Sequence, residues 1–182
     1  MNAVSTGLLV LRLVVGIGLA AHGAQKLFGW WGGPGVRGLL GHLTHMRFRP
    51  APMWVAGAIG TEIGGGALLA LGLLSPLGSA GVGAAMLMAI AAFHWGKGFF
   101  GQSGGFETPL LYLVAAAAVG ITGPGSYSLD ALFGITLPEP VVGLVAAALT
   151  VGGVAVAMAG RRSAAPALET APAEQTTPRI AA

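Results

Sequence analysis

The sequence has 182 residues, of which 54% are hydrophobic and only 8% charged, and its mean hydropathy is +0.79. In soluble domains about a quarter of the residues are charged. This composition therefore excludes a water-soluble domain and indicates an integral membrane protein. The nine basic residues form no dense stripe, which argues against nucleic acid as a partner, and the lack of cysteine excludes disulfides and cysteine-bound iron–sulfur clusters in this chain.

Long apolar runs predict the membrane-spanning elements. About 20 helical residues cross a bilayer core of about 30 Å. Measured against that length, the sequence predicts five helices near residues 5–27, 52–73, 77–96, 109–122 and 140–160. The runs are continuous and rich in Ala and Leu, whereas the strands of a membrane barrel alternate in hydrophobicity with a period of two. We therefore expect an all-α fold, a polytopic transmembrane helical bundle.

The first two predicted helices carry features that bear on packing and processing. The first lacks a basic segment before its apolar stretch and contains Arg12, so we expect a true transmembrane helix rather than a signal peptide. Small residues allow helix backbones to approach closely in membranes. Because the second helix contains Gly60, Gly64 and Gly65, we expect it to be the most closely packed.

The distribution of basic residues predicts the topology. Eight of the nine Lys and Arg residues fall in three segments, residues 26–50, 97–108 and 161–182. Cytoplasmic loops carry the excess of basic residues, so we expect the N-terminus outside and the C-terminus in the cytoplasm. The segment 161–182 is rich in Pro, Ala and Thr and cannot bury a core, which predicts a disordered cytoplasmic tail.

Two charged residues fall inside predicted helices, where a charge costs several kcal/mol. Glu62 lies at the middle of the second helix, and Arg12 lies about four residues from the middle of the first. Since the two helices are antiparallel neighbours, we expect these residues to form an ion pair. The pair would either fix only the helix register or leave Glu62 able to exchange protons with a bound molecule.

A second polar group gathers near the predicted cytoplasmic ends of three helices. Its members are His22, Gln25, Lys26, His94, Trp95 and Glu107. His22 and Lys26 are four residues apart and therefore share a helix face. Two imidazoles at this depth are suited to relay protons, to bond a quinone or to ligate haem, although haem requires both histidines to point at one iron. The alternative is interfacial anchoring, with Lys26 reaching towards water and the tryptophan in an aromatic belt.

The glycine-rich segment between the first two helices resembles a nucleotide-binding turn only formally. Gly33–Gly38 matches G-x-G-x-x-G, but no strand precedes it, so we interpret the segment as a flexible connector at the interface. His42 and His45 lie in the same segment without a nearby carboxylate or thiol, and we expect no metal site there. Met86 in the third helix is interpreted as a packing residue.

Four motifs together resemble the DoxX family of small bacterial membrane proteins. They are HGAQKLFGWWGGPG (22–35), TEIGGGALLALGLLSPLG (61–78), FHWGKGFFGQSGGFETPLL (93–111) and GPGSYSLD (123–130). The resemblance covers about residues 7–134 and implies a four-helix transmembrane bundle over residues 1–135. The helix at 136–160 and the tail at 161–182 would then be additions to the family's fold.

The resemblance also implies a function. The family takes its name from a membrane subunit associated with thiosulfate:quinone oxidoreductase, and other members resemble partners in a membrane complex that handles thiol and oxidative stress. For this chain it implies a quinone-linked redox role in the bacterial inner membrane. Because the chain contains no cysteine, the electrons would come from a partner, a reduced sulfur substrate or an unseen cofactor. The implied catalytic residues are Glu62, His94 and Glu107. The residues implied to bind the quinone are Arg12, His22, Lys26, His94 and Trp95.

Two other functions remain open at this point. The bundle could be a non-enzymatic scaffold or assembly factor for a soluble redox enzyme or another membrane subunit. A small transporter is suggested by Glu62 at the middle of the bilayer, but five short helices without an inverted repeat disfavour it. The glycine-rich faces would serve either a homo-oligomer or packing within one bundle.

Overall fold

The computed structural model of the chain describes residues 2–137 and 139–163. Its long apolar elements are α1 (Ala3–Phe28), α3 (Ala51–Gly60) continued by the π turn η2 (Thr61–Gly65) and α4 (Gly66–Leu71), α5 (Ser75–Ala89) continued by η3 (Ile90–His94) and η4 (Trp95–Lys97), α6 (Glu107–Thr122) and α8 (Glu139–Ser163). Shorter elements in the connections are η1 (Trp30–Gly32), α2 (Gly35–His45), η5 (Gly101–Ser103) and α7 (Leu129–Phe133). No strand occurs among the described residues, and the predicted all-α bundle is confirmed.

The helices have the lengths that a bilayer requires. Four segments are long and apolar enough to cross a membrane, at residues 3–28, 51–71, 75–97 and 141–161. The fifth, α6, has 16 residues and is also apolar, which corresponds to about 24 Å at the helical rise. It begins at Glu107 rather than at residue 109, since an acidic side chain is favourable in the first turn of a helix. The chain is a multi-pass membrane protein.

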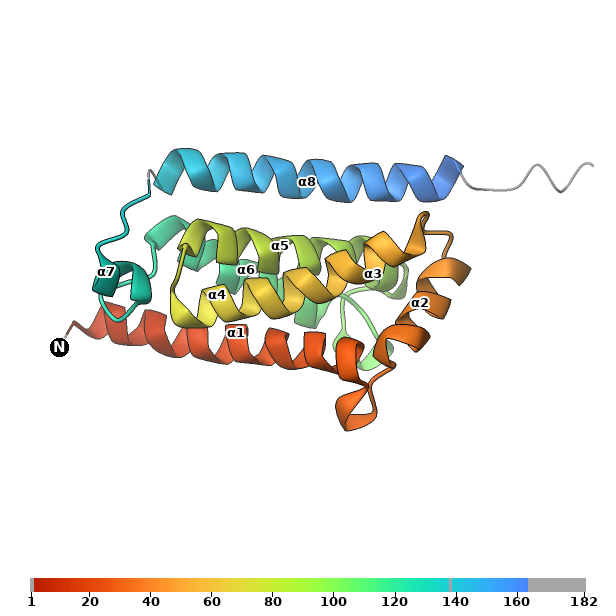
Figure 1. Cartoon of the computed structure of the whole chain (residues 1–182), viewed down its shortest axis with the longest axis horizontal. Coiled ribbons are helices and arrows are strands. Elements are labelled where there is room, and N and C mark those ends of the chain that lie inside the picture. Colours follow the sequence, from red (N-terminus) through yellow and green to blue (C-terminus); the bar gives the residue numbers. More distant parts are fainter. Residues whose placement is uncertain (1, 138, 164–182) are drawn as a thin grey trace, which may run out of the picture.

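The helices run side by side, with the connections gathered at two ends (Figure 1). The start of α1, the turn between α4 and α5, and α7 lie at one end, and α2 and the last turns of α1 and α8 lie at the other. The helix α8 runs along the outer side of α5, and it also contacts α6. The segments that carry eight of the nine basic residues begin at one and the same end of the bundle.

The closest contact between two helices joins α1 and α4. A Cβ atom added to Gly66 would lie 2.6 Å from the carbonyl oxygen of Gly16, and one added to Gly16 would lie 2.4 Å from the carbonyl oxygen of Gly66. A Cβ atom added to Gly65 would likewise lie 3.0 Å from the carbonyl carbon of Gly81 in α5. A Cβ on Gly60 or Gly64 would meet nothing within 4 Å, so only Gly65 of the three predicted glycines contributes to close packing.

The core around this crossing is built from aliphatic side chains. Its most buried members are Leu19, Leu69, Val82, Ala116 and Val119. Met86 belongs to the same cluster, and its interpretation as a packing residue is confirmed. On the outside, large apolar side chains such as Ile121 are exposed, as expected of surfaces that face lipid.

The connector predicted to be flexible contains an ordered amphipathic helix. The two leucines Leu39 and Leu43, spaced by four residues, are buried on one face of α2 and pack in a cluster with Phe48 and Val55. The glycines that suggested a flexible loop include Gly35, which opens the helix at φ +61°. The interpretation failed because the leucine spacing, rather than the glycine content, decides the local structure.

The predicted start of the tail, residue 161, is also too early in the chain. Residues 161–163 continue α8, and the Nε atom of Arg161 donates a hydrogen bond to the carbonyl oxygen of Met46 at 3.1 Å. The guanidinium also lies over the Phe48 ring at 4.8 Å. The last turn of α8 is therefore fastened to the connection between α2 and α3. The rest of the predicted tail, residues 164–182, lies outside the described residues.

The crossing of α1 and α4 predicts how substitutions of glycine affect stability. Gly66→Ala forces two backbones apart and should lower the free energy of unfolding by about 1–3 kcal/mol. Gly64→Ala, two residues away in open space, should leave it unchanged or raise it by less than about 1 kcal/mol. Unfolding by a denaturing detergent in mixed micelles measures both variants. Equal stability of the two would contradict the contact.

Candidate functional site

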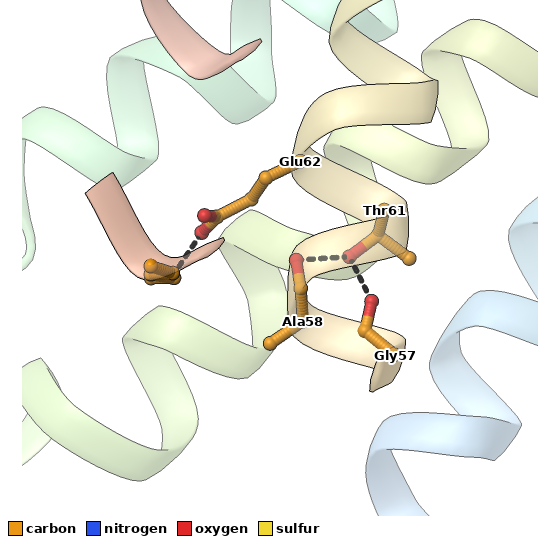
Figure 2. A network of polar contacts seen from close by, with 5 residues as sticks. Gly57, Ala58, Thr61 and Glu62 are labelled. Carbon is orange, nitrogen blue, oxygen red and sulfur yellow. Dashed lines mark hydrogen bonds and ion pairs between the residues drawn. The ribbon is translucent and has the colours of Figure 1, made fainter. Parts of the chain in front are cut away.

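A partly buried ion pair joins the end of α1 to the π turn of the second span. The Nζ atom of Lys26 binds Oε1 of Glu62, whose carboxylate points away from its own helix towards α1 (Figure 2). The Glu62 side chain is 6% exposed and that of Lys26 is 29% exposed. The second carboxylate oxygen, Oε2, is buried and has no hydrogen-bond partner among the described residues. One carboxylate oxygen is thus paired with the Lys26 ammonium, while the other remains able to accept a proton or a hydrogen bond.

Local backbone geometry places Glu62 at this contact. Gly23 of α1 lies so close that an added Cβ would be 2.5 Å from Cγ1 of Ile63 and 3.1 Å from Cβ of Glu62. The π turn inserts a residue into the helix, and such turns recur at functional sites. The Thr61 hydroxyl, at the start of this turn, donates to the carbonyl oxygen of Gly57 at 2.8 Å (Figure 2).

His94 and Glu107 are joined through the loop between η4 and α6, not through each other. Nδ1 of His94 donates to the carbonyl oxygen of Gly104 at 2.7 Å, because a carbonyl only accepts. Oε2 of Glu107 accepts from the backbone N–H of Gly101 at 2.8 Å. Both side chains therefore hold this loop in shape. With the Nδ1 proton used in this bond, an uncharged ring would have Nε2 as an acceptor.

The predicted cytoplasmic group thus separates into parts. His22 is exposed on α1, and its side chain makes no hydrogen bond within the part of the chain that the structure describes. Trp95 is exposed and stacks on Phe106 with ring centroids 5.5 Å apart. His42 lies on α2 and stacks on Phe93. No three His, Asp or Glu residues in the described segments gather as a metal site.

The expected ion pair between Arg12 and Glu62 is wrong. Arg12 is fully buried and donates from Nη2 to the carbonyl oxygen of Tyr127, at the opposite end of α1 from Lys26. Glu62 instead packs beside Gly23, eleven residues beyond Arg12, or about 16 Å along the helix. The guanidinium cannot cover that distance. Sequence position in adjacent helices did not reveal how the two helices are offset.

Arg12 has a different acidic neighbour, Asp130, which the sequence reasoning missed. The guanidinium interacts electrostatically with the buried Asp130 carboxylate. Asp130 also accepts hydrogen bonds from the backbone N–H groups of Leu74 and Ser75, at 2.8 and 3.0 Å, and from the Ser75 hydroxyl at 2.7 Å. The carboxylate therefore caps the first turn of α5 and ties α7 to it. The signal was present in the GPGSYSLD motif, which ends at this residue.

Gly72 makes room for this arrangement. Its φ is +61°, and an added Cβ would lie 1.6 Å from Nη1 of Arg12. Nε and Nη1 of Arg12 are buried without a hydrogen-bond partner among the described residues. Beside this end of α1 lies a largely apolar groove of about 490 Å³, bounded by Leu13, Leu71 and Tyr127 among others. The Arg12 site connects three chain segments and has the character of a structural anchor.

Comparison with known proteins bears on these sites. Residues 7–95 match the model of the DoxX family. This part of the chain belongs to the DoxX family. The DoxX match includes Arg12, Lys26, Glu62 and His94, and it ends before Glu107 and Asp130. Neither the comparison with curated proteins nor that with solved structures finds a match.

The Arg12 anchor predicts unequal effects of two neighbouring substitutions. Asp130→Ala removes three hydrogen bonds and leaves the buried guanidinium without its acidic neighbour, so the free energy of unfolding should fall by about 3–5 kcal/mol. Ser75→Ala removes one neutral donor and should cost about 1 kcal/mol. Thermal unfolding in detergent, followed by size-exclusion chromatography, compares them. A loss in Asp130→Ala no greater than that in Ser75→Ala would contradict the anchor.

Proposed function

We propose that this DoxX protein is the membrane subunit of a quinone-linked redox complex, in which the Lys26–Glu62 pair exchanges protons with a quinone bound on the outer face of α1. The observation that carries the proposal is the buried Glu62 carboxylate, which has one oxygen on Lys26 and the other without a partner among the described residues. A carboxylate is expensive inside a membrane, and intramembrane ionisable groups commonly serve proton or ion pathways.

The pair has the properties that a proton-exchanging group requires. Lys26 occupies Oε1, and Oε2 is left without a partner among the described residues, so the carboxylate has one oxygen held in place and one open to a proton. Reduction of a quinone consumes two electrons and two protons. Glu62 would hold one such proton at Oε2, and Lys26, with its partly exposed ammonium, would connect the carboxylate to the interface.

His22 is the best placed group to bind the quinone ring. It lies one helical turn before Lys26, and its exposed imidazole is able to donate a hydrogen bond to a carbonyl oxygen. Towards the bilayer centre Val14, eight residues before His22, is exposed on α1 and would contact an apolar quinone tail. The electrons would come from a partner protein with its own redox centre, because the chain contains no cysteine to relay them.

The other residues implied by the family take supporting roles in this proposal. His94 and Glu107 would hold the loop before α6 beside the interface, and Trp95 would anchor it in the headgroup region. Nε2 of His94 would be a second proton acceptor. Arg12 would act as a positioning residue, since it shapes the opposite end of the bundle.

A second function, a scaffold for a partner redox enzyme, is favoured by the same loop. His94 and Glu107 are both used to build it, and Trp95 and Phe100 are exposed on it at 69% and 68%. A loop that is internally hydrogen-bonded and externally aromatic is suited to contact another protein. Co-purification of a soluble redox enzyme, together with the absence of quinone binding, would favour the scaffold over the quinone-linked subunit.

The quinone proposal predicts two measurable effects in nanodiscs. His22→Ala should weaken the binding of a short-chain quinone about fivefold to tenfold, as expected from the loss of one hydrogen bond, while His45→Ala, an exposed histidine on α2, should leave it unchanged. The infrared difference spectrum between the quinone and quinol states should contain a carboxylic acid band that disappears in Glu62→Gln. Unchanged affinity in His22→Ala and a spectrum without the Glu62 band would overturn the proposal.

We also propose that the protein lies in the bacterial inner membrane with its N-terminus outside and its C-terminus in the cytoplasm. The support is that the basic segments begin at one end of the bundle and that the positive-inside rule assigns this end to the cytoplasm. Alkaline phosphatase, which is active only after export, should be inactive when fused after Ser163. The same enzyme fused after Gly123, at the opposite end, should be active. The reverse pattern would contradict this topology.

A further inference from the structure

A small groove lies where the last turn of α8 meets η3 and the connection between α2 and α3. Its volume is about 290 Å³. It is lined by Met46, Arg47, Ala91, Ala92, Met158 and Arg161. Two of these residues are arginines and none is acidic, so the groove combines two positive charges with the apolar side chains of Ala and Met. It belongs neither to the Lys26–Glu62 pair nor to the Arg12 anchor.

Arg47 occupies a backbone position that normally belongs to glycine. The helix α2 ends in a Schellman motif, in which the N–H of Phe48 bonds the carbonyl of Leu43 and the N–H of Arg47 bonds that of Thr44, both at 3.0 Å. Arg47 adopts a φ of +63°, in the left-handed region that disfavours branched and bulky side chains. An unfavourable residue at a site where glycine would fit better suggests that its side chain has a role beyond folding.

Arg161 lines the groove from α8, and contacts within the chain hold its side chain in place. Its Nε bonds the carbonyl of Met46 at 3.1 Å, Nη1 lies 3.5 Å from the sulfur of Met158, and the guanidinium rests over Phe48. These contacts fix the plane of the guanidinium. Two like charges along one groove repel each other, and an anion between them removes that repulsion. Arginine guanidinium groups bind phosphate oxygens through directed pairs of hydrogen bonds.

We propose that this groove binds the headgroup phosphate of an anionic phospholipid. The phosphate would lie between Arg47 and Arg161, and the small side chains Ala91 and Ala92 would leave space for the first part of an acyl chain. The depth fits this occupant, because the groove lies at the end of the α8 span, where the bilayer interface is expected. The exposed Arg49, two residues after Arg47, adds a further positive charge to this connection.

The strain at Arg47 permits a test that separates binding from folding. In detergent without added lipid, Arg47→Gly should unfold at the same temperature as the wild type or a higher one, because glycine adopts the left-handed conformation without cost. Phosphatidylglycerol should raise the unfolding temperature of the wild type, and phosphatidylcholine should raise it much less. In Arg47→Gly the affinity for phosphatidylglycerol, counted by native mass spectrometry, should fall at least about tenfold.

Two control variants test whether binding depends on the arginines of the groove and on the shape of the guanidinium. Arg37→Gln removes an exposed charge at the other end of α2 and should keep the affinity for phosphatidylglycerol. Arg161→Lys retains the charge without the planar fork and should lose affinity. Full retention of binding in Arg47→Gly would overturn the proposal. An equal stabilisation by inorganic phosphate alone would also overturn it, because the site would then bind a free anion rather than a lipid.

Discussion

The close crossing of α1 and α4 at Gly16 and Gly66 is the constraint on which the other features depend. In a bilayer, helix association is driven by packing rather than by exclusion of water, and backbones approach this closely only where both side chains are absent. The carbonyl oxygens at the crossing leave less than 3 Å for an added Cβ on either helix. The crossing fixes how far one helix is displaced along the other, and so it decides which residues face each other.

Each buried charge obtains its partner according to that displacement. Arg12 lies before the crossing and meets the end of α4, where Gly72 leaves space for its guanidinium. Lys26 lies beyond the crossing and meets Glu62. The bundle therefore contains two separate polar sites, one near each end, with an aliphatic core between them. Both sites retain buried polar atoms without a hydrogen-bond partner among the described residues, Nε and Nη1 at Arg12 and Oε2 at Glu62. We place the proposed chemistry at Glu62, because a carboxylate oxygen can accept a proton and a guanidinium cannot.

The helix α8 packs against α2 and its connection to α3, at the end of the bundle where the basic segments begin. Ala157 of α8 is buried in the same cluster as Leu43 and Phe48, and Arg161 stacks on Phe48. The helix lies outside the DoxX match, yet it completes a cluster whose other buried members lie between Leu39 and Val55, within that match. The Lys26–Glu62 pair, the loop between η4 and α6 and the proposed lipid groove lie towards this end of the bundle. A partner protein or a change in lipid composition at this end would thus act close to Glu62.

The amino-acid sequence by itself determined the membrane class, the all-α fold and the approximate position of each of the five helices, because burial in lipid requires long apolar segments that are visible without any tertiary information. It also identified Arg12, Lys26, Glu62 and His94 as ionisable residues in apolar helices, where such residues require a partner or a function. Only the tertiary structure decided their partners, the order in α2 and the role of Asp130. These depend on helix offset and on contacts between residues more than fifty positions apart, such as Asp130 with Ser75, and neither composition nor periodicity encodes such distances.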